Sequence, residues 1–330
     1  MSGKVAILAN PMSGRDVRRL AARATNMTHE AKRDLVARVA AGVDAMGVDE
    51  IFIIKEPFRV STGALEQMPL RAKVTVLDVG VTNSAADTVN AVRACRDAGC
   101  DVVVSLGGDG TNRIIARTWP DVPLVPLSTG TNNVFPILIE ATSAGVAAGL
   151  IATGRLSASE VAHRCKLVHV RTEKLHDIGV IDAVLLRNDH IGNFLPFDPE
   201  RIVALVLTRA EPAAVGMSPI GGLLDPVGFH DDWGLAVTCG VGQSLQVPIS
   251  PGLFRTVRVA PPQRLAFDSA FEFIGPGIIA FDGDREHKLA DGERASVTVR
   301  RDGPPVVDVA GAIQVAARRG LFAGMEIPGA

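Results

Sequence analysis

The sequence predicts two domains of different fold class, an α/β domain followed by an all-β domain. The chain has 330 residues, of which 47% are hydrophobic, which is enough for two domains with separate cores. In the first half, short apolar runs alternate with segments of helical periodicity, as in a doubly wound parallel sheet. After about residue 157, short β-branched runs follow one another between turn residues, which favours a β-sandwich-like domain.

The predicted domain boundaries follow this change of pattern. Residues 1–157 form the α/β domain, residues 158–309 the all-β domain and residues 310–330 a C-terminal tail. Ala310–Arg319 in the tail has helical character, so the tail is expected to be able to pack back on the body of the protein.

In the first domain, apolar runs and helical stripes alternate four times. The predicted strands are Lys4–Ala9, Glu50–Ile54, Val74–Val79, Asp101–Leu106 and Val122–Leu127. A first helix is expected between a cap at Thr28 and about Met46, because apolar residues recur there on one stripe. Further helices are predicted at Asn83–Ala98, Asn112–Thr118 and Ser143–Thr153.

The second domain shows strand patterns without long helical periods. Its predicted strands are Lys166–Arg171, Gly179–Leu186, Ile202–Thr208, Leu235–Cys239, Arg255–Val259, Phe271–Ile274, Ile278–Phe281 and Ser296–Arg300. Turn residues separate these runs, as is typical of antiparallel sheets.

Composition excludes several classes of partner. The 34 Lys and Arg residues are balanced by 36 Asp and Glu residues, so no basic field exists for nucleic acid. No apolar run approaches the roughly 18 residues of a membrane helix, so no membrane insertion is expected. The four cysteines form no CxxC pair, which indicates a reducing compartment, and a cytoplasmic location is expected.

Common nucleotide and hydrolase motifs are missing from the sequence. It contains neither GxxxxGK[ST] nor a strand followed by GxGxxG, which excludes a P-loop NTPase and a standard dinucleotide dehydrogenase. The segment Gly216–Gly221 misses the GxSxG nucleophile elbow by one residue, and Pro219 follows its serine, so a hydrolase is excluded as well.

A glycine-rich turn, Gly107–Thr111 (GGDGT), lies between the fourth predicted strand and a helix. Glycines let backbone N–H groups approach a ligand, and a helix start favours negative charge, so phosphate is the expected ligand. A carboxylate in this turn would repel phosphate unless it binds a metal ion or takes a proton from an attacking hydroxyl. Asp109 is therefore a candidate catalytic residue and Mg²⁺ ligand, and the alternative is a tight turn that Asp109 caps.

Two further turns leave the ends of predicted strands. Asn10–Arg15 follows the first strand, and Ser128–Asn133 follows the fifth. Open α/β sheets bind ligands at this edge. Ser13, Gly14 and Arg15 offer a hydroxyl, an amide and a guanidinium to phosphate, although an ordinary loop is the alternative there. Together with GGDGT, these turns predict a nucleotide-binding crevice.

Three acids at alternate positions, Asp282, Asp284 and Glu286, follow the predicted strand Ile278–Phe281. This spacing can bind a divalent metal ion. The calcium-loop template fails, however, because His287 stands where its glycine is required. A charged hairpin turn is the alternative.

The order of these motifs resembles that of the superfamily that joins NAD kinases to diacylglycerol and sphingosine kinases. The shared motifs are Asn10-Pro-x-Ser-Gly14, GGDGT, Gly130-Thr-Asn-Asn133 and an Asp-Gly pair in the β domain. Within the superfamily, the chain is similar to the ATP-NAD kinase-like branch that includes the acetoin-catabolism X protein. Its segment Ala210–Val227 resembles a segment of that branch and the serine- and glycine-rich NAD loop of NAD kinases.

The resemblance implies a role for each matching residue. Asp109 would be the catalytic aspartate. The residues that would contact phosphates are Gly107, Gly108, Gly110 and Thr111. The donor nucleotide would be held by Asn10, Ser13, Gly14, Gly130, Thr131, Asn132 and Asn133.

The acceptor side is implied by the β domain. Asp282 and Gly283 match the Asp-Gly pair, and Asp284 stands third, where lipid kinases carry Glu and NAD kinases Gln. Asp284 would be a second catalytic acid. Asn188 and Asp189 stand for the Asn-Glu pair that grips adenosine in NAD kinases, and Ser218 lies in the segment similar to the NAD loop.

The resemblance implies a kinase that uses ATP and Mg²⁺ to phosphorylate a hydroxyl acceptor, with the 2′-hydroxyl of NAD as the expected acceptor and NADP as the product. Small-molecule nucleotides are the expected partners. The resemblance also implies that the protein forms a homo-oligomer. Two alternatives remain, a lipid or other small-alcohol kinase and a non-catalytic nucleotide-binding regulator of an acetoin-type catabolic pathway.

Overall fold

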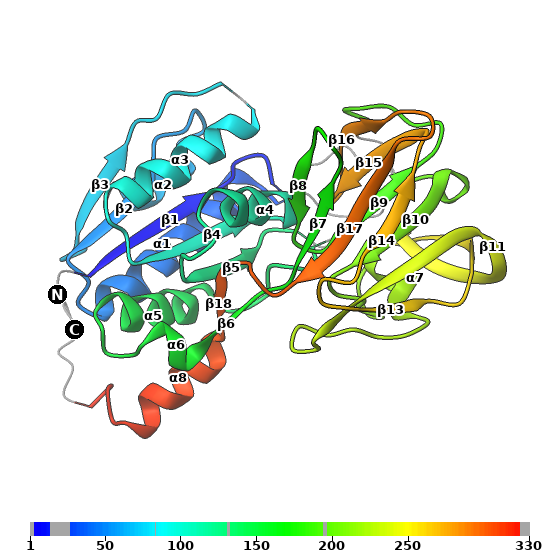
Figure 1. Cartoon of the computed structure of the whole chain (residues 1–330). Coiled ribbons are helices and arrows are strands. Elements are labelled where there is room, and N and C mark those ends of the chain that lie inside the picture. The colour runs from blue at the N-terminus through cyan, green and yellow to red at the C-terminus, as the bar shows by residue number, and fades with distance from the viewer. Residues whose placement is uncertain (1–2, 14–26, 83, 131–132, 194–196, 324–330) are drawn as a thin grey trace.

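Three β-sheets organise the chain in the computed structural model, one largely parallel and two antiparallel (Figure 1). The structure describes residues 3–13, 27–82, 84–130, 133–193 and 197–323. The parallel sheet and its helices form the first domain, and the antiparallel sheets form the second (Figure 1).

The first sheet has seven strands in the order β3-β2-β1-β4-β5-β18-β6. They are β1 (Lys4–Ala9), β2 (Glu50–Ile54), β3 (Lys73–Leu77), β4 (Val102–Gly107), β5 (Leu124–Ser128), β6 (Ala162–Arg164) and β18 (Pro305–Val307). The pairs among β1 to β5 are all parallel. The winding direction reverses between β1 and β4, and such a switch point is where open α/β sheets bind ligands.

Helices cover both faces of this sheet, because alternate residues of its strands are apolar on both sides. Val5 and Ile7 of β1 join one core, while Ala6 and Leu8 join the other. The first core also contains residues of α1 (His29–Ala45), α2 (Val60–Leu65), α5 (Ala141–Ala152), α6 (Ala158–Val161) and α8 (Val309–Arg318). The opposite core contains residues of α3 (Ala85–Asp97) and α4 (Asp109–Thr118).

The second domain is a sandwich of two antiparallel sheets. The larger sheet contains β9 (Asp182–Leu186), β10 (Ile202–Leu207), β11 (Trp233–Ser250), β12 (Leu253–Val259), β13 (Gln263–Ala266), β15 (Gly277–Phe281) and β16 (Asp284–Leu289). The smaller sheet contains β7 (Leu167–Arg171), β8 (His176–Gly179), β14 (Phe271–Ile274) and β17 (Arg294–Arg300). A short 3-10 helix, Pro199–Arg201, precedes β10.

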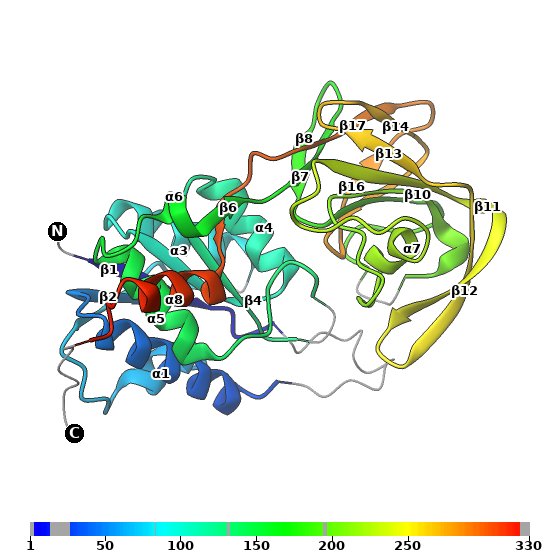
Figure 2. The ribbon, with the colours of Figure 1, turned by 90° about the horizontal axis from the view of Figure 1, so that it is seen from below.

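Strand β10 is apolar throughout because both of its faces are buried. Ala204 and Val206 pack between the two sheets, and Leu205 and Leu207 pack on the other side. That outer side is covered by α7 (Ser218–Gly222), which lies against the sheet near β11 (Figure 2).

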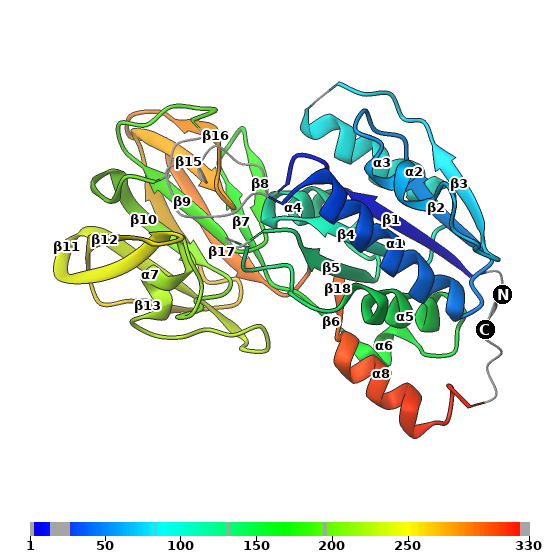
Figure 3. The ribbon, with the colours of Figure 1, turned by 180° about the vertical axis from the view of Figure 1, so that it is seen from behind.

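The predicted fold class is confirmed, and several elements differ in detail. Strands β6 and β18 lie within the predicted second domain but complete the first sheet, since β18 pairs with β5 and with β6. Each is only three residues long, so its sequence did not show which sheet it would join. Helix α4 begins at Asp109 rather than at Asn112. The predicted tail helix is α8, and it lies beside α5 and α6 of the first domain (Figures 1 and 3).

Among the helices of the described residues, none is both long enough and apolar enough to cross a bilayer.

Candidate active site

A cleft of about 1210 Å³ is lined by residues of both domains. The first domain contributes Asn10–Ser13 after β1 and Gly108–Thr111 after β4. The second domain contributes Asp282–His287, which are the turn of the β15–β16 hairpin and the first residues of β16. The cleft therefore lies at the switch point of the parallel sheet, where the sequence predicted a crevice.

Side-chain hydrogen bonds join the three predicted phosphate-binding turns. Asn10 Nδ2 donates to Thr111 Oγ1 over 2.9 Å, which links the turns after β1 and β4. Thr129 donates its hydroxyl to Ser13 Oγ over 2.7 Å, which links the turns after β5 and β1. Asn10 Oδ1 also accepts from the backbone N–H of Met12 over 2.9 Å. The turns at the carboxyl ends of the parallel strands are thus held together by Asn10, Ser13 and Thr111.

A buried lysine that the sequence analysis missed supports the first of these turns. Lys32 of α1 is fully buried, and its ammonium donates to the carbonyl oxygens of Asn10 (2.9 Å) and Pro11 (2.6 Å). A signal was present in the sequence, because Lys32 lies in line with Val36 and Val39 on the apolar stripe of α1.

Asp109 lies in the first turn of α4 but does not cap that helix. Gly108 occupies the N-cap position, without a side-chain capping bond. The Asp109 carboxylate instead accepts the backbone N–H groups of Phe135 (Oδ1, 2.9 Å) and Val134 (Oδ1, 3.1 Å), which follow β5. The alternative of a helix-capping aspartate is therefore wrong, and the carboxylate is held at the cleft by a neighbouring loop.

The surroundings of Asp109 favour its protonated form more than water does. Burial raises the pKa of Asp109 to about 7, and the nearby charge of Asp282 adds to the increase. The two backbone N–H groups and the charge of Arg209 act in the opposite direction. Arg209 was missed by the sequence analysis, and its Nη1 donates to the carbonyl oxygen of Val134 over 2.8 Å.

The glycines of GGDGT are required by close contacts rather than by unusual backbone angles. A β-carbon at Gly107 would lie 2.6 Å from the Thr111 side chain, and one at Gly108 would lie 2.9 Å from Asn133 Oδ1. A β-carbon at Gly110 would lie 3.1 Å from Asp284 Oδ2. The last contact brings a carboxylate of the second domain directly onto the GGDGT turn.

The β15–β16 hairpin turn explains why Asp282 and Gly283 stand side by side. Both have positive φ, 50° for Asp282 and 95° for Gly283, as an Asp-Gly hairpin turn of type I′ requires. The Asp282 carboxylate accepts three backbone N–H groups, from Val180 and Ile181 at 2.8 Å and from Asp182 at 3.1 Å. Asp282 and Gly283 line the cleft, but the Asp282 carboxylate is occupied in joining β15 to the β8–β9 connection.

Two further predicted donor-site residues, Gly130 and Asn133, lie at the turn after β5. Asn133 Nδ2 donates to Ser128 Oγ over 3.1 Å, and Ser128 Oγ donates to the carbonyl oxygen of Gly130 over 2.8 Å. Asn133 lines the cleft. The predicted residues Gly14, Thr131 and Asn132 lie outside the described residues.

The predicted acceptor residues Asn188 and Asp189 are not among the residues that line the cleft. Asn188 has a positive φ of 54° in the loop after β9. Asp189 is buried and accepts from Arg285 Nε over 2.9 Å and from Asn193 Nδ2 over 2.6 Å. Arg285 and Asn193 do line the cleft, so Asp189 holds two cleft-lining residues in place without lining the cleft itself.

Ser218, the third predicted acceptor residue, borders the cleft at the start of α7. Its hydroxyl accepts from the backbone N–H of Glu211 over 2.8 Å and donates to the carbonyl oxygen of Arg209 over 2.9 Å. Ser218 thereby fastens α7 to the loop after β10. These two hydrogen bonds are structural.

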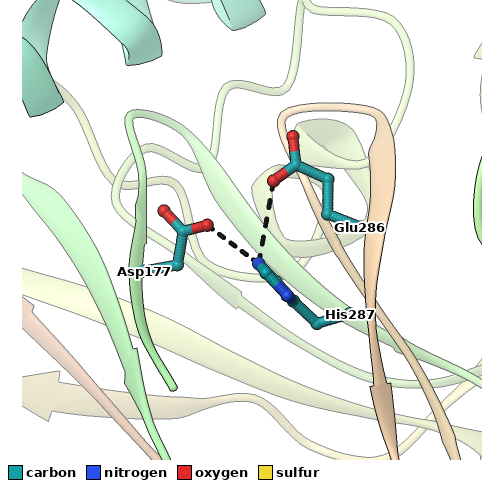
Figure 4. Close-up of side chains that lie close together, drawn as sticks. All are labelled: Asp177, Glu286 and His287. Carbon is teal, nitrogen blue, oxygen red and sulfur yellow. Dashed lines mark hydrogen bonds and ion pairs between the residues drawn. The ribbon is translucent and has the colours of Figure 1, made fainter. Parts of the chain in front are cut away.

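A cluster of Asp177, Glu286 and His287 lies beside the cleft (Figure 4). One potential ligand atom of each residue lies within 4.8 Å of the others, and His287 Nε2 is 2.9 Å from Asp177 Oδ2. Arg113, however, donates to both carboxylates, over 2.8 Å in each case. Burial opposes ionisation of Asp177, but the His287 hydrogen bond and the Arg113 charge outweigh it and hold its pKa well below the usual range. The cluster is therefore an ion-pair network, in which the arginine supplies the positive charge.

The predicted Mg²⁺ site fits the chemistry of the cleft. Mg²⁺ is bound in proteins by one or two carboxylates together with waters and substrate phosphates. Asp109 and Asp284 both line the cleft from opposite domains, and Asp284 Oδ2 lies against Gly110. Asp284 would hold the ion, next to the turn that contains Asp109. Asp282 fits less well, because its carboxylate accepts three backbone N–H groups, whereas that of Asp109 accepts two.

Comparison with known proteins defines the class of each domain. The model of the ATP-NAD kinase N-terminal domain matches residues 5–155, which include the turns after β1, β4 and β5. The model of the acetoin catabolism protein X C-terminal domain matches residues 166–302, which include the β15–β16 hairpin. The chain thus joins an ATP-NAD kinase-like N-terminal domain to this second type of domain.

The chain belongs to the acetoin catabolism protein X family. It is 35% identical over 343 aligned residues to acetoin catabolism protein X of Cupriavidus necator (strain ATCC 17699 / DSM 428 / KCTC 22496 / NCIMB 10442 / H16 / Stanier 337), covering 99% of this chain and 96% of the relative. An uncharacterized protein of Archaeoglobus fulgidus is 46% identical over 57 residues, 17% of this chain and 19% of that protein. Among solved structures, the chain is similar to a putative diacylglycerol kinase from Bacillus anthracis str. Sterne, with a TM-score of 0.47, 11% identity and coverage of 92% and 97%.

Proposed function

We propose that the protein is a phosphotransferase that uses ATP and Mg²⁺ to phosphorylate the 2′-hydroxyl of NAD. The observation that carries the proposal is the meeting of Asp109 and Asp284 at the switch-point cleft. Both carboxylates lie at or beside the GGDGT turn, whose glycines let backbone N–H groups approach a phosphate closely. The match to the ATP-NAD kinase N-terminal domain supports the same reaction class and NAD as the acceptor.

The chemistry asked of the protein is positioning and proton transfer. The acceptor oxygen bonds to the γ-phosphorus, the bond from that phosphorus to the β–γ bridging oxygen breaks, and ADP leaves. Asp109 accepts the proton of the acceptor hydroxyl, and its pKa of about 7 suits a base that works near neutral pH. When bound, Mg²⁺ neutralises charge on the phosphate oxygens, and Asp284 would be its ligand from the second domain.

The first-domain end of the cleft supports a nucleoside triphosphate as the donor, rather than polyphosphate. Lys55–Phe58 after β2 and Val79–Val81 after β3 line the same cleft as GGDGT. At about 4.8 Å per strand, these loops lie roughly 10 and 14 Å from the turn after β4. Phe58 is 38% exposed there, and its ring offers a surface on which a nucleobase can stack. A triphosphate that reaches GGDGT would place its base over this end.

A second candidate function comes from the name of the relative, which refers to acetoin catabolism. In this candidate the protein binds nucleotides as a regulator of such a pathway and has no turnover. The two candidates predict the same ligands and differ only in the product.

The test is an assay of the full chain with ATP, Mg²⁺ and NAD, in which NADP is detected by an NADP-specific dehydrogenase. We expect NADP to form with the wild type and not measurably with Asp109→Asn. Binding of ATP and NAD without product would overturn the kinase and support the regulator. Phosphorylation of a diacylglycerol in mixed micelles, but not of NAD, would overturn NAD as the acceptor and retain the kinase.

A further inference from the structure

Arg113 joins the helix that carries Asp109 to the second domain. It lies on α4, four residues after Asp109, and its side chain is only 3% exposed. Its Nη1 and Nη2 atoms donate to the two oxygens of Glu286 on β16, over 2.8 and 2.9 Å. Nη2 also donates to Asp177 Oδ2 on β8 over 2.8 Å, and Nε donates to the carbonyl oxygen of Ile178 over 2.5 Å.

This set of contacts fixes the orientation of the guanidinium as well as its location. The paired bonds to Glu286 have the two-pronged geometry that only arginine can offer to a carboxylate. The guanidinium carbon also lies 4.5 Å from the centre of the Phe281 ring on β15. Three strands of the second domain are thus anchored to one side chain of α4.

Two positions of α4 lie next to two nearby positions of β16. Gly110 and Arg113 are three residues apart on α4 and lie on one face of the helix. Asp284 begins β16, and Glu286, two residues later, lies at a register shift between β15 and β16, where it has no partner on β15. A β-carbon at Gly110 would lie 3.1 Å from Asp284 Oδ2, and Arg113 donates to Glu286. The ion pair therefore sets where Asp284 stands relative to the turn that contains Asp109.

We propose that Arg113 is a positioning residue, which acts through Glu286 to hold Asp284 over the Asp109–Gly110 turn. Its effect on the reaction rate rests on the proposed function, whereas its effect on the position of β16 does not. A buried ion pair contributes little net stability, because desolvation of the charges offsets their attraction. Its main consequence here is a fixed geometry across the cleft between two acids on different domains.

The gentlest way to loosen this link is Glu286→Gln, because Glu286 is 35% exposed and glutamine keeps its shape. Arg113→Lys keeps the charge but cannot form the paired bonds. Arg117→Ala is the matched control. Arg117 lies on the same helix and pairs with the same Asp177 at 3.3 Å, but it is 44% exposed and this ion pair reaches β8 rather than β16.

The kinetic test is a double-mutant cycle between Glu286→Gln and Asp284→Asn in the NADP-forming assay. We expect Glu286→Gln to lower kcat about 10- to 100-fold with KM for ATP nearly unchanged, because misplacement of reacting groups costs this much. In the Asp284→Asn background the same change should lower kcat less than about twofold. Arg113→Lys should behave as Glu286→Gln, and Arg117→Ala as the wild type. Equal losses in both backgrounds would overturn the proposal.

A second measurement does not depend on turnover. Hydrogen exchange of the full chain should become about tenfold faster over Asp284–Leu289 in Glu286→Gln and in Arg113→Lys, and should stay at the wild-type rate in Arg117→Ala. If the wild type forms no NADP, the proposed function fails, and faster exchange still supports the anchoring of β16 by Arg113. Unchanged exchange over Asp284–Leu289 in both variants would overturn the inference, whatever the activity of the wild type.

Discussion

The cleft is bordered by two acidic glycine turns that look alike in the sequence, GGDG at Gly107–Gly110 and DGD at Asp282–Asp284. In the first, the central carboxylate of Asp109 is held by two N–H groups of the neighbouring loop and lines the cleft. In the second, the carboxylate of Asp282 accepts three N–H groups and joins two strand connections. The next acid, Asp284, is the one placed against the other turn.

The difference shows that a residue's place in a motif does not determine its task. Asp109 follows a strand of the parallel sheet, and its helix starts at the cleft. Asp282 occupies a hairpin position that requires positive φ, and its carboxylate is taken up by backbone N–H groups. The second turn therefore contributes to the structure through Asp282 and to the proposed chemistry through Asp284.

Removal of the charge at Asp109 should give the largest effect. Loss of a proton acceptor costs about 10²- to 10⁴-fold in rate. We therefore expect kcat of Asp109→Asn to fall by that factor, while the melting temperature does not fall, because asparagine can still accept N–H bonds at its oxygen. NADP formation and thermal unfolding measured on the same preparation check this. Near-normal kcat would remove Asp109 from the reaction.

The stability of the wild type should depend on pH through Asp109. Its pKa is raised from 3.8 to about 7 in the folded state, so ionisation of Asp109 opposes folding. Stability relative to Asp109→Asn should therefore be highest below about pH 4 and decline up to about pH 7. The loss is at most about 4 kcal/mol. Urea unfolding of both proteins from pH 4 to 8 measures it, and a constant difference would contradict the raised pKa.

The two acids of the hairpin should separate into a stability effect and a rate effect. Asp282→Asn leaves the N–H of Val180 without its carboxylate acceptor, which should cost about 1–3 kcal/mol of stability with a small change in kcat. Asparagine tolerates the positive φ of this position, so the turn itself is not strained. Asp284→Asn should lower kcat about 10- to 100-fold with stability unchanged. The opposite assignment of effects would reverse the roles given to the two residues.

The nucleobase surface at the first-domain end can be tested without an acceptor. Phe58→Ala should raise the Kd for ATP about tenfold, because stacking on an aromatic ring is lost, and leave the Kd for inorganic tripolyphosphate unchanged. Phe254→Ala is the control, since Phe254 is an exposed phenylalanine of β12 that does not line the cleft. Calorimetric titration measures both constants. Equal losses for both ligands would rule out base stacking on Phe58.

The contact between the two turns should give the smallest effect. Gly110→Ala places a β-carbon 3.1 Å from Asp284 Oδ2, so Asp284 must shift by a few tenths of an ångström. We expect kcat to fall about three- to tenfold while stability rises by roughly 0.5–1 kcal/mol, since alanine favours a helix over glycine. Gly63→Ala in α2 is the control and should raise stability alone. A gain in stability at Gly110 without a loss of rate would show that Asp284 is not tightly placed.

Much of the fold follows from local pattern. The alternation of apolar strands and helical stripes predicted β1 to β5, α1, α3 and α5, and Phe271–Ile274 matches β14 residue for residue. The turn residues of GGDGT and of the first strand's loop also lie where the sequence placed them, because parallel strands end at one edge of a sheet.

The sequence could not show which sheet a short strand would join. It also could not show which acid of the second domain would lie next to the GGDGT turn. Lys32, Arg209 and Arg113 act through partners that are 21 to 173 positions away in the chain. Local periodicity reports only which residues share a face of one element. The roles of Asp282 and Asp284 depend on the pairing of β15 with β9 and on the packing of β16 against α4, and only the tertiary structure brings those elements together.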